Sequence, residues 1–571
     1  MTANERYEEW YRSVPADDPL RADLEAIKGS EEDINDRFYN VIAFGTAGLR
    51  GKYGAGTDRM NDYTVGRATC GIAEYILSSG EDYGKGVVMA FDCRYHSQEF
   101  AEQAAEIFAG HGIKAYLFPS LRPTPELSFA IRELGALAGV NLTASHNPKE
   151  YNGYKVYWKD GAQISGNVAD GMSAAIGKRS FFDPVPKMEL SKAIEDGIVV
   201  MLGEEMDAAY RNYVLGRTQR DEGLDKSVRI VYTPLHGAGS IPVMQVLGER
   251  GFYNAKIVEA QKDPDPEFST VGYPNPEDPR GFAMAEEYGR ETNAELLIAT
   301  DPDSDRMAIE ILTKDGEYKF LNGNQTGALL INYMATAQAE KGLLDPKDSG
   351  KVMVKSIVTG DLGAVICKHY GIAVDEALTG FKNICGRIPV WEERGKTCFF
   401  AYEESIGCAP DPGVRDKDGI CAAMLIAEMA AYYKAKGMTV EDALQEIYDT
   451  YGAYGEDQVS LILEGVAGQE RIARIMEEFR GTYGQEDTAD TPLGKLGFRK
   501  MIDYKNGYEE VPASNVLKFL FDDGSWFAMR PSGTEPKLKY YYYAVRGTMA
   551  ESNERIAELR KAVEAQTETV A

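Results

Sequence analysis

The sequence contains no run of 18 uncharged apolar residues, although a membrane-spanning helix needs a stretch of about that length. Its first ten residues are acidic and amphipathic, so they also lack the apolar core of a secretion signal. These two absences predict a cytoplasmic protein with no membrane partner.

Cysteine is scarce and scattered along the chain. The seven cysteines are an odd number, and no two of them form a Cys-x-x-Cys pair. Disulfide frameworks and thiolate metal sites depend on paired and regularly spaced cysteines. We therefore expect reduced, mostly structural thiols at Cys70, Cys93, Cys367, Cys385, Cys398, Cys408 and Cys421.

Positive charge is in deficit. The 62 Lys and Arg residues stand against 90 Asp and Glu residues, which gives a formal net charge of −28. Because nucleic acids and anionic membranes are bound through basic patches, this balance predicts a small-molecule partner and no nucleic acid. Salt screens distant surface charge over about 8 to 10 Å, so a locally basic site for an anion remains compatible with it. We expect a monomer or a weak homodimer.

The chain has no sequence repeat of fixed period, yet its 571 residues are too many for one hydrophobic core, since cores stop growing near roughly 250 to 300 residues. An apolar fraction of 44% and a charged fraction of 27% are near the averages for globular proteins. Several folded domains are therefore expected, with candidate boundaries in the polar stretches 216–227, 313–325 and 448–457.

Strand-like and helical patterns alternate through most of the chain. Residues 86–91 and 136–142 are apolar and strand-like, and residues 98–110 between them have a helical pattern. The same rhythm recurs after the apolar segments 228–232 and 351–355. This alternation predicts an α/β fold.

The last part of the chain has a different pattern. Strand-like segments at 516–521, 525–529 and 538–545 follow one another and precede an amphipathic helical segment at 551–564. Strands followed by a helix predict a small α+β domain.

One serine loop is well placed for chemistry. Leu142-Thr-Ala-Ser-His-Asn-Pro148 follows an apolar strand, and open α/β sheets bind ligands at the carboxyl ends of their strands. No Gly-x-Ser-x-Gly frame surrounds Ser145, so an esterase-type nucleophile elbow is unsupported. The alternative is a turn in which Ser145, His146 and Asn147 only cap the backbone.

A lysine follows this loop. Asn152-Gly153 lies between strand-like flanks and predicts a β-hairpin that folds Lys155 back toward the serine. A lysine that is partly desolvated and held beside other cations can lose its proton near neutral pH, which suits a general base. The alternative is a solvated lysine on a strand.

Three aspartates at alternate positions form the most specific local signal. Asp301, Asp303 and Asp305 follow an apolar strand, and hard oxygen ligands on a tight loop suit Mg²⁺. A calcium EF-hand is excluded, because its sixth and twelfth positions, Gly and Glu, are here Arg306 and Leu312. Arg306 would favour a phosphate shared with the metal. The alternative is an acidic turn without a metal.

Two further loops have the composition of ligand-binding loops. Arg530-Pro-Ser-Gly-Thr-Glu-Pro-Lys537 offers a guanidinium, hydroxyls and backbone N–H groups that suit a phosphate. Tyr402-Glu-Glu-Ser-Ile-Gly407 offers carboxylates and a hydroxyl that suit paired hydrogen bonds to vicinal sugar hydroxyls. Thr379-Gly-Phe-Lys-Asn383 could add a cation.

Five segments together resemble the α-D-phosphohexomutases, most closely the phosphoglucomutase and phosphopentomutase-like branch. They occur in the family's order and span nearly the whole chain: Phe44-Gly-Thr-Ala-Gly-Leu-Arg-Gly51, Thr143-Ala-Ser-His-Asn-Pro148, Asp301-Pro-Asp-Ser-Asp-Arg306, Glu403-Glu-Ser-Ile-Gly407 and Arg530-Pro-Ser-Gly-Thr534.

The resemblance implies three related α/β domains plus a C-terminal α+β domain, arranged around one active-site cleft. The implied domains are residues 1–210 with a phosphoserine loop, 211–324 with a metal-binding loop, 325–450 with a sugar-recognition loop and 451–571 with a phosphate-binding loop.

It also implies roles for particular residues. The phosphoryl carrier is Ser145, and the implied metal ligands are Ser145, Asp301, Asp303 and Asp305. The implied catalytic set is Ser145, Lys155, His146, Arg50 and Arg306. The implied substrate-binding set is Glu403, Ser405, Lys382, Arg530, Ser532, Gly533 and Thr534.

The activity implied is the reversible conversion of glucose 1-phosphate to glucose 6-phosphate, an intramolecular phosphotransfer of the isomerase class. It would use Mg²⁺, a phosphoserine enzyme and glucose 1,6-bisphosphate as intermediate and activator, with sugar phosphates as partners. The sugar loop differs from the Gly-Glu-x-Ser-Gly-His form of the phosphomannomutase and phosphoglucosamine mutase branches, which favours glucose or pentose phosphates. Alternatives are a phosphopentomutase, a glucose-1,6-bisphosphate synthase and a noncatalytic sugar-phosphate sensor.

Overall fold

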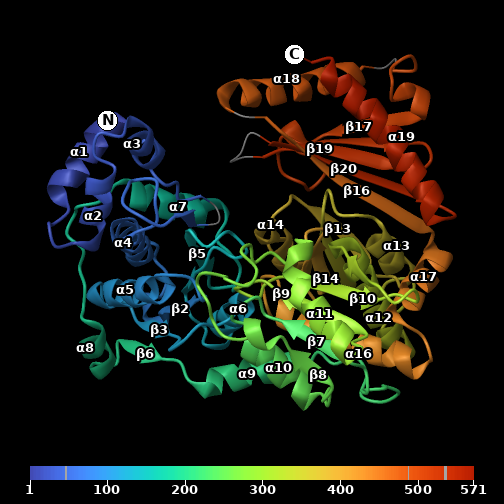
Figure 1. Cartoon of the computed structure of the whole chain (residues 1–571), viewed down its shortest axis with the longest axis horizontal. Helices are drawn as coiled ribbons and strands as arrows, with labels where there is room; N and C mark the ends of the chain where they lie inside the picture. The colour runs from blue at the N-terminus through green and yellow to red at the C-terminus, as the bar shows by residue number, and fades with distance from the viewer. Residues whose placement is uncertain (46–47, 464, 486–487, 533–536, 571) are drawn as a thin grey trace.

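Four β-sheets follow one another along the chain (Figure 1). The computed structural model describes residues 1–45, 48–463, 465–485, 488–532 and 537–570. Over these residues, no helix combines the length and the apolar character needed to cross a membrane. The fold is the expected one: three α/β units are followed by a terminal sheet with its own helices.

The first sheet has the strand order β1-β5-β4-β2-β3-β6. Its strands are β1 (Leu49–Lys52), β2 (Val87–Phe91), β3 (Ala115–Leu117), β4 (Ala138–Leu142), β5 (Tyr151–Trp158) and β6 (Val199–Met201). The accompanying helices are α1 (Ala3–Ser13), α2 (Pro19–Ala26), α3 (Glu31–Phe38), α4 (Asp62–Ser78), α5 (Ser97–Gly110), α6 (Thr124–Glu133), α7 (Gly166–Gly177) and α8 (Leu190–Glu195). The predicted strands at 86–91 and 136–142 and the predicted helix at 98–110 are confirmed as β2, β4 and α5.

The predicted hairpin at Asn152-Gly153 is wrong. Both residues lie inside β5, a continuous strand that pairs antiparallel with β1 and β4. Gly153 is needed for close packing, because a Cβ there would lie 2.5 Å from Thr143 O. Asn152 donates to Ser97 Oγ at 3.0 Å. The reversal of the chain occurs earlier, in the serine loop between β4 and β5.

The second and third sheets have the orders β11-β10-β9-β7-β8 and β13-β12-β14-β15. Their strands are β7 (Ile230–Thr233), β8 (Ala255–Ile257), β9 (Leu296–Thr300), β10 (Met307–Leu312), β11 (Tyr318–Leu321), β12 (Lys351–Ser356), β13 (Ala373–Ala377), β14 (Thr397–Glu403) and β15 (Gly407–Ala409). Their helices are α9 (Glu204–Leu215), α10 (Ser240–Glu249), α11 (Ala283–Thr292), α12 (Gly323–Glu340), α13 (Leu362–His369), α14 (Phe381–Cys385), α15 (Arg387–Glu393), α16 (Gly419–Ala435) and α17 (Val440–Tyr451).

The fourth sheet is antiparallel, with the order β16-β20-β19-β18-β17. Its strands are β16 (Ala453–Ile462), β17 (Phe498–Asp503), β18 (Leu517–Phe521), β19 (Trp526–Pro531) and β20 (Lys537–Arg546), and its helices are α18 (Gly465–Tyr483) and α19 (Met549–Glu568). The α+β prediction for this block is confirmed.

Two of the apolar clusters of the molecule show how its units pack. One apolar cluster runs from Val88 on β2 to Ala453 on β16 and includes residues of the first three sheets. Helix α16 is buried over most of its length, as its largely apolar sequence requires. The fourth sheet packs α18 and α19 in a separate core. Figure 1 shows this last unit above the second and third sheets and to one side of the first.

Candidate active site

The serine loop connects β4 to β5, and Ser145 has a left-handed backbone there, with φ 53°. Its N–H donates to Thr143 Oγ1 at 2.8 Å, and that hydroxyl donates to Asp92 Oδ2 at 2.6 Å. Left-handed residues other than glycine are uncommon and cluster at functional sites. The loop therefore holds Ser145 in one conformation beyond the end of β4.

Arg94 lies buried beneath this loop. Its Nη2 donates to Ser145 O at 2.6 Å, and its Nη1 donates to Pro148 O at 2.8 Å and to Tyr151 O at 3.0 Å. The Asp92 carboxylate lies 3.2 Å from Arg94 Nε and balances its charge. One guanidinium group thus joins the serine to the start of β5.

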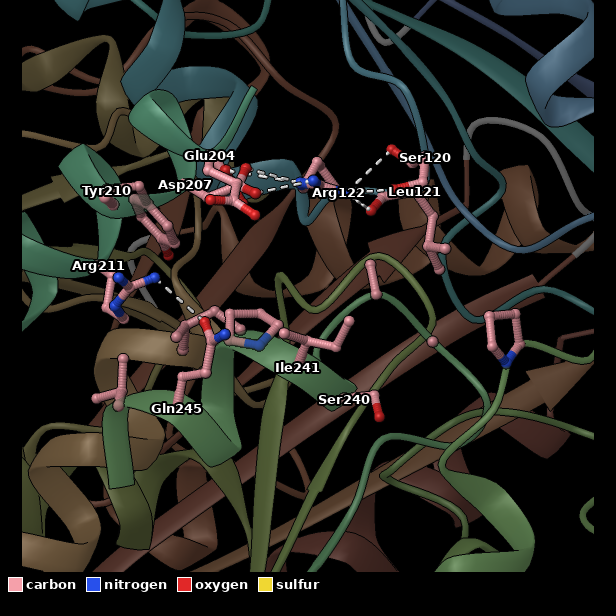
Figure 2. Close-up of a pocket in the computed structure, with 18 of the residues that line it drawn as sticks. Ser120, Leu121, Arg122, Glu204, Asp207, Tyr210, Arg211, Ser240, Ile241 and Gln245 are labelled. Carbon is pink, nitrogen blue, oxygen red and sulfur yellow. Dashed lines mark hydrogen bonds and ion pairs between the residues drawn. The ribbon is translucent and has the colours of Figure 1, made fainter. Parts of the chain in front are cut away.

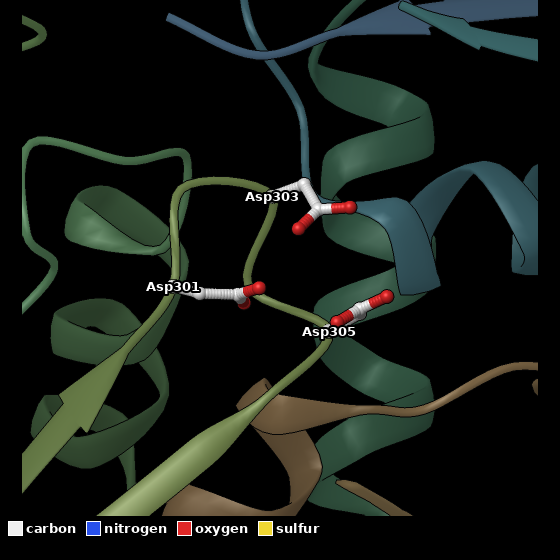
Figure 3. Close-up of side chains that lie close together, drawn as sticks. All are labelled: Asp301, Asp303 and Asp305. Carbon is white, nitrogen blue, oxygen red and sulfur yellow. The ribbon is translucent and has the colours of Figure 1, made fainter. Parts of the chain in front are cut away.

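Three aspartates converge in the loop between β9 and β10 (Figure 3). Ligand oxygens of Asp301, Asp303 and Asp305 lie within 4.8 Å of one another, and all three residues are buried. Ser145 Oγ donates to Asp301 Oδ2 at 2.7 Å. The predicted serine, from the first sheet, and the predicted carboxylates, from the second, therefore meet.

This cluster fits a divalent cation. Asp303 Oδ1 and Asp305 Oδ1 are buried and have no hydrogen-bond partner in the part of the chain that the structure describes. Burial, and then repulsion by Asp303 and Asp305, raises the pKa of Asp301 well above its usual range. A cation would relieve that repulsion, and Mg²⁺ prefers such oxygen ligands. The cluster has the donor set of a metal site.

Two buried lysines flank the carboxylates. Lys155 Nζ lies 2.6 Å from Asp303 Oδ2 and 3.5 Å from Asp305 Oδ2, and Lys417 Nζ lies 2.9 Å from Asp305 Oδ2. Burial lowers the pKa of Lys155, but attraction to Asp303 and Asp305 outweighs it, so the pKa is raised.

The expected loss of the Lys155 proton near neutral pH is therefore wrong for this arrangement. The residue faces carboxylates at close range, and these outweigh the neighbouring cations. A solvated lysine on the strand is also wrong, because only 6% of the side chain is exposed.

His146 and Arg50 adjoin the serine. His146 Nδ1 lies 3.1 Å from Ser145 Oγ. Burial, and then the charges of Arg306 and Arg50, lowers the pKa of His146 well below its usual value, so the ring is neutral at pH 7. Arg50 lies on β1, and its Nη1 donates to Asn147 Oδ1 at 3.4 Å.

Arg306 extends the site away from the metal loop. Its Nε lies 4.0 Å from Asp305 Oδ1, and its Nη1 lies 3.9 Å from Glu277 Oε2. Burial lowers the pKa of Arg306, but the carboxylates of Glu277 and Asp305 outweigh it, and the net shift is upward. The guanidinium is therefore cationic between two acidic groups.

A cavity of about 410 Å³ shares Glu277 with this contact. Residues of the second, third and fourth sheet units line it: Glu277, Thr379, Gly380, Glu403, Glu404, Ser405, Gln458, Arg530, Lys539 and Tyr541. Glu403 Oε1 accepts a hydrogen bond from the Gly380 N–H at 2.6 Å. Burial, and then Glu404, raises the pKa of Glu403.

The fourth unit contributes the cations of this cavity. Arg530 on β19 and Lys539 on β20 are direct cross-strand partners. Like charges at such positions destabilise a sheet. Burial, and then Lys537 and Arg530, lowers the pKa of Lys539. A bound anion would relieve the repulsion between Arg530 and Lys539. This pair of cations therefore suits a phosphate.

The remaining predicted binding residues are less well supported. Lys382 lies half-buried on α14 and is not among the residues that line the cavity. Ser532 follows β19, and its N–H donates to Lys537 O at 2.7 Å. Gly533 and Thr534 lie outside the described residues.

Several residues of the site were not predicted from the sequence, among them Lys417, Glu277 and Arg94. Lys417 and Glu277 reach it from loops outside every motif, and Arg94 comes from the loop after β2. Arg94 had a usable signal, because it follows an apolar strand in Asp92-Cys-Arg94. Only the packing of the loops brings Lys417 and Glu277 to the site.

The chain matches four consecutive family models. They are phosphoglucomutase/phosphomannomutase α/β/α domain I over residues 41–182, domain II over 208–313, domain III over 322–451 and the C-terminal domain over 497–565. Together they cover most of the chain in the order of the four sheets.

Known proteins resemble the chain over most of its length. A phosphoglucomutase of Staphylococcus aureus is 37% identical over 524 residues, which is 89% of this chain and 90% of that protein. The structure of parafusin, a Paramecium phosphoglucomutase in its open form, aligns with a TM-score of 0.69 at 18% identity over 93% of this chain and 95% of that one. A phosphoglucomutase/phosphomannomutase family protein of Burkholderia thailandensis aligns with a TM-score of 0.65 at 17% identity over 92% and 98%.

At these identities the two structures support the fold, and the sequence relatives and family models support the family. The chain belongs to the phosphoglucomutase/phosphomannomutase family.

Proposed function

We propose that this protein is a phosphoglucomutase that interconverts glucose 1-phosphate and glucose 6-phosphate, with glucose 1,6-bisphosphate as the intermediate and activator. The observation that carries the proposal is the contact of Ser145 Oγ with Asp301 at 2.7 Å, inside a buried cluster of three carboxylates. A transferable hydroxyl beside a metal site is what phosphoryl transfer through the protein requires.

Ser145 would carry the phosphoryl group. A sugar hydroxyl oxygen attacks the phosphorus, the bond to Ser145 Oγ breaks, and the hydroxyl proton passes to a nearby base. Asp301, Asp303 and Asp305 would hold Mg²⁺, which supplies a Lewis acid for the phosphoryl oxygens. Arg50 and Arg306 would stabilise the charge that spreads over those oxygens.

Lys155 is the proposed proton carrier. Its proton is held by Asp303 and Asp305 in the arrangement described. When the carboxylates are engaged by a metal they attract the ammonium less, and burial then favours the neutral amine. The same group would act as the base in one half of the cycle and as the acid in the other.

The cavity beside Arg306 would hold the sugar and its distal phosphate. Glu403 and Ser405 line it on one side, and Arg530 lines it on another. We propose that Glu403 and Ser405 bind sugar hydroxyls and that Arg530 and Ser532 bind the phosphate that does not react, with Gly533, Thr534 and Lys382 as further contacts. The bisphosphate must turn between half-cycles, because Ser145 serves both ends.

The proposal includes a cytoplasmic location, a monomer or weak homodimer, and the domain boundaries predicted from the sequence. The scattered, unpaired cysteines of the chain are typical of a reducing compartment and support the cytoplasmic location.

Substitution of the carrier tests the mechanism. Ser145→Ala should lose measurable turnover of glucose 1-phosphate with Mg²⁺ and a trace of glucose 1,6-bisphosphate, because the transferred phosphoryl group then has no carrier. Ser78→Ala, at an exposed helix end, should retain full activity. Mass spectrometry should locate phosphate on Ser145 of the wild-type protein. Full turnover by Ser145→Ala would refute the phosphoserine mechanism.

A further inference from the structure

A second cavity, of about 500 Å³, lies between the first and second sheet units (Figure 2). It is bordered by α9, by the start of α10, and by the segments 120–126 and 262–264. We propose that it binds a small organic cation with a primary ammonium group and that its occupant is coupled to the metal loop. The binding of the cation is independent of the proposed function, whereas the coupling rests on the metal site of that proposal.

The charges of the lining favour a cation. Arg122 forms a two-point ion pair with Asp207, with both N–O distances at 2.8 Å (Figure 2). The two other lining cations are paired with acids outside the lining: Arg211 with Glu249 at 2.7 Å, and Lys262 with Glu259.

The lining therefore has a surplus of acid. Its four carboxyl groups are those of Glu126, Glu204, Asp207 and Asp263, whereas Arg122 is its one cation that pairs within the lining, as far as the described residues go. An anionic sugar phosphate would be repelled, and a cation would be attracted. This is the opposite of the active-site cavity, where Arg530 and Lys539 face each other.

Glu126 gives the ammonium group a specific position. Its side chain is only 3% exposed, and its nearest cation, Arg122 Nε, is 3.9 Å from Oε1. Oε1 has no hydrogen-bond partner within the described residues. Burial, and then a side-chain hydrogen bond to Asp207, raises the pKa of Glu126 well above its usual range. An N–H donor from a cation would satisfy the oxygen and favour the ionised form of the Glu126 carboxyl group.

The apolar lining of the cavity can contact the hydrocarbon part of such a ligand. Leu121, Pro242 and Val246 give the cavity apolar surface, and Ile241 is 67% exposed beside them. Ligand cavities in proteins usually measure roughly 300 to 1,000 Å³. The volume of about 500 Å³ is large enough for a six-carbon chain, and we propose that its charged end lies at Glu126.

The cavity adjoins the metal loop through backbone contacts. Thr124 lies two residues before Glu126, and its N–H and Oγ1 donate to Asp303 O at 2.9 Å and to Asp303 Oδ2 at 2.7 Å. The Ala238 N–H, at the start of α10, donates to Pro302 O at 2.8 Å. A ligand that shifts the first turn of α6 or of α10 must therefore move the residues beside the metal ligands.

Binding of three isosteric probes tests the charge preference. Calorimetric titration of the whole protein with hexylammonium, 1-hexanol and hexanoate, in the presence of saturating glucose 6-phosphate, should rank hexylammonium first. We expect it to bind at least about tenfold more tightly than 1-hexanol, the equivalent of one charge-assisted hydrogen bond. Equal affinity for hexylammonium and 1-hexanol would overturn the proposal.

Variants locate the site. Glu126→Gln should weaken hexylammonium binding at least about tenfold. Glu133→Gln, at an exposed position on the same helix α6, should leave it unchanged. If Glu126→Gln does not fold, Ile241→Lys places a cation at the mouth and should weaken binding similarly, whereas Ile241→Gln should not. Unchanged binding in Glu126→Gln, or in Ile241→Lys, would overturn the assignment.

A separate measurement, of Mg²⁺ affinity, tests the coupling between the cavity and the metal loop. Saturating hexylammonium should change the affinity of the wild-type protein for Mg²⁺ at least about fivefold, which is the lower range of measured couplings. The change should be absent in Glu126→Gln. Equal Mg²⁺ affinity with and without hexylammonium would overturn the coupling to the metal loop.

Discussion

At the scale of single residues, two serines in the loops of the site have left-handed backbones. Ser145 and Ser304 both have φ 53°, one in the serine loop and one in the metal loop. Such conformations cost of order 1 kcal/mol or more and persist only where the surroundings enforce them. At Ser145 the enforcing group is Arg94, which binds the carbonyl of the serine itself.

Replacement of Arg94 by the shorter lysine should reduce the catalytic rate. Arg94→Lys keeps the positive charge beside Asp92 but cannot reach all the carbonyl groups that the guanidinium joins. Because a misplacement of about 1 Å can cost roughly 10²-fold, we expect kcat to fall by about that factor, with a smaller change in KM. Steady-state kinetics measures both.

Arg132→Lys is the matched control for this change. Arg132 is exposed, and its Nη1 donates to one carbonyl, that of Asp160, at 3.0 Å. Its kinetics should stay at the wild-type level. A kcat of Arg94→Lys equal to that of Arg132→Lys would show that Arg94 does not position the serine.

At the scale of elements, the turn that begins α10 packs against the metal loop without side chains. A Cβ on Gly237 would lie 2.5 Å from Pro302 Cα, and one on Gly239 would lie 2.7 Å from Ser304 Oγ. Gly237 therefore permits a close approach of two backbones, and Gly239 leaves room for the Ser304 hydroxyl. Together with the hydrogen bond from the Ala238 N–H to Pro302 O, this contact constrains the path of the metal loop.

A side chain added at Gly237 should displace the metal loop. Gly237→Ala should lower the free energy of unfolding by about 1 to 3 kcal/mol, as overpacking does, and should raise the Mg²⁺ concentration needed for half-maximal activity. Gly248→Ala is the control, because it lies on α10 with nothing within 4 Å of the added Cβ. That change should be neutral or stabilising, since alanine favours helices.

Chemical denaturation and a Mg²⁺ titration of activity measure the two effects. If Gly237→Ala and Gly248→Ala behave alike in both measurements, the contact between α10 and the metal loop has no structural importance.

At the scale of the whole molecule, an apolar cluster and several polar contacts join the fourth unit to the third. Lys518 Nζ donates to Ile357 O at 2.9 Å, and the Tyr543 hydroxyl donates to Val358 O at 2.8 Å. Glu456 on β16 accepts from Asn322 Nδ2 at 2.8 Å and also from Asn324. These contacts set where the cations of the fourth unit stand in the active-site cavity.

The Glu456 contact should make stability depend on pH. Burial raises the pKa of Glu456 to about 7 from an ordinary value of 4.5, although the amides of Asn324 and Asn322 oppose the shift. A raised folded-state pKa adds stability that is fully present below about pH 4.5 and is lost as the pH rises through about 7. The melting temperature should therefore fall across this window.

Glu456→Gln should flatten this dependence, because the amide does not titrate. Glu446→Gln, at an exposed position on α17, should keep the wild-type profile. Melting temperatures at intervals from pH 4.5 to 8 would decide the point. A Glu456→Gln profile parallel to that of the wild type would assign the dependence to other groups.

Sequence patterns predicted the elements and the motifs because both are local. The alternation of apolar residues identified β2, β4 and α5, and the spacing of Asp301, Asp303 and Asp305 indicated their common chemistry. The family resemblance supplied the order of the four units. These features depend on residues close together in the chain.

The errors arose where a residue's surroundings come from distant parts of the chain. By itself, the Asn152-Gly153 pair is typical of a turn. In the structure it belongs to β5, which pairs with β1 and β4. The proton affinity of Lys155 depends on carboxylates about 150 residues away, at Asp303 and Asp305.

The sequence alone determined which reactive and binding groups this protein contains. They are a serine after a strand, three carboxylates at alternate positions, and cations in the C-terminal unit. The tertiary structure decided which of them touch, and therefore their charge states. Coulombic interaction and desolvation act through space over a few ångströms, so the contacts of Ser145 with Asp301 and of Lys155 with Asp303 are set by packing between units.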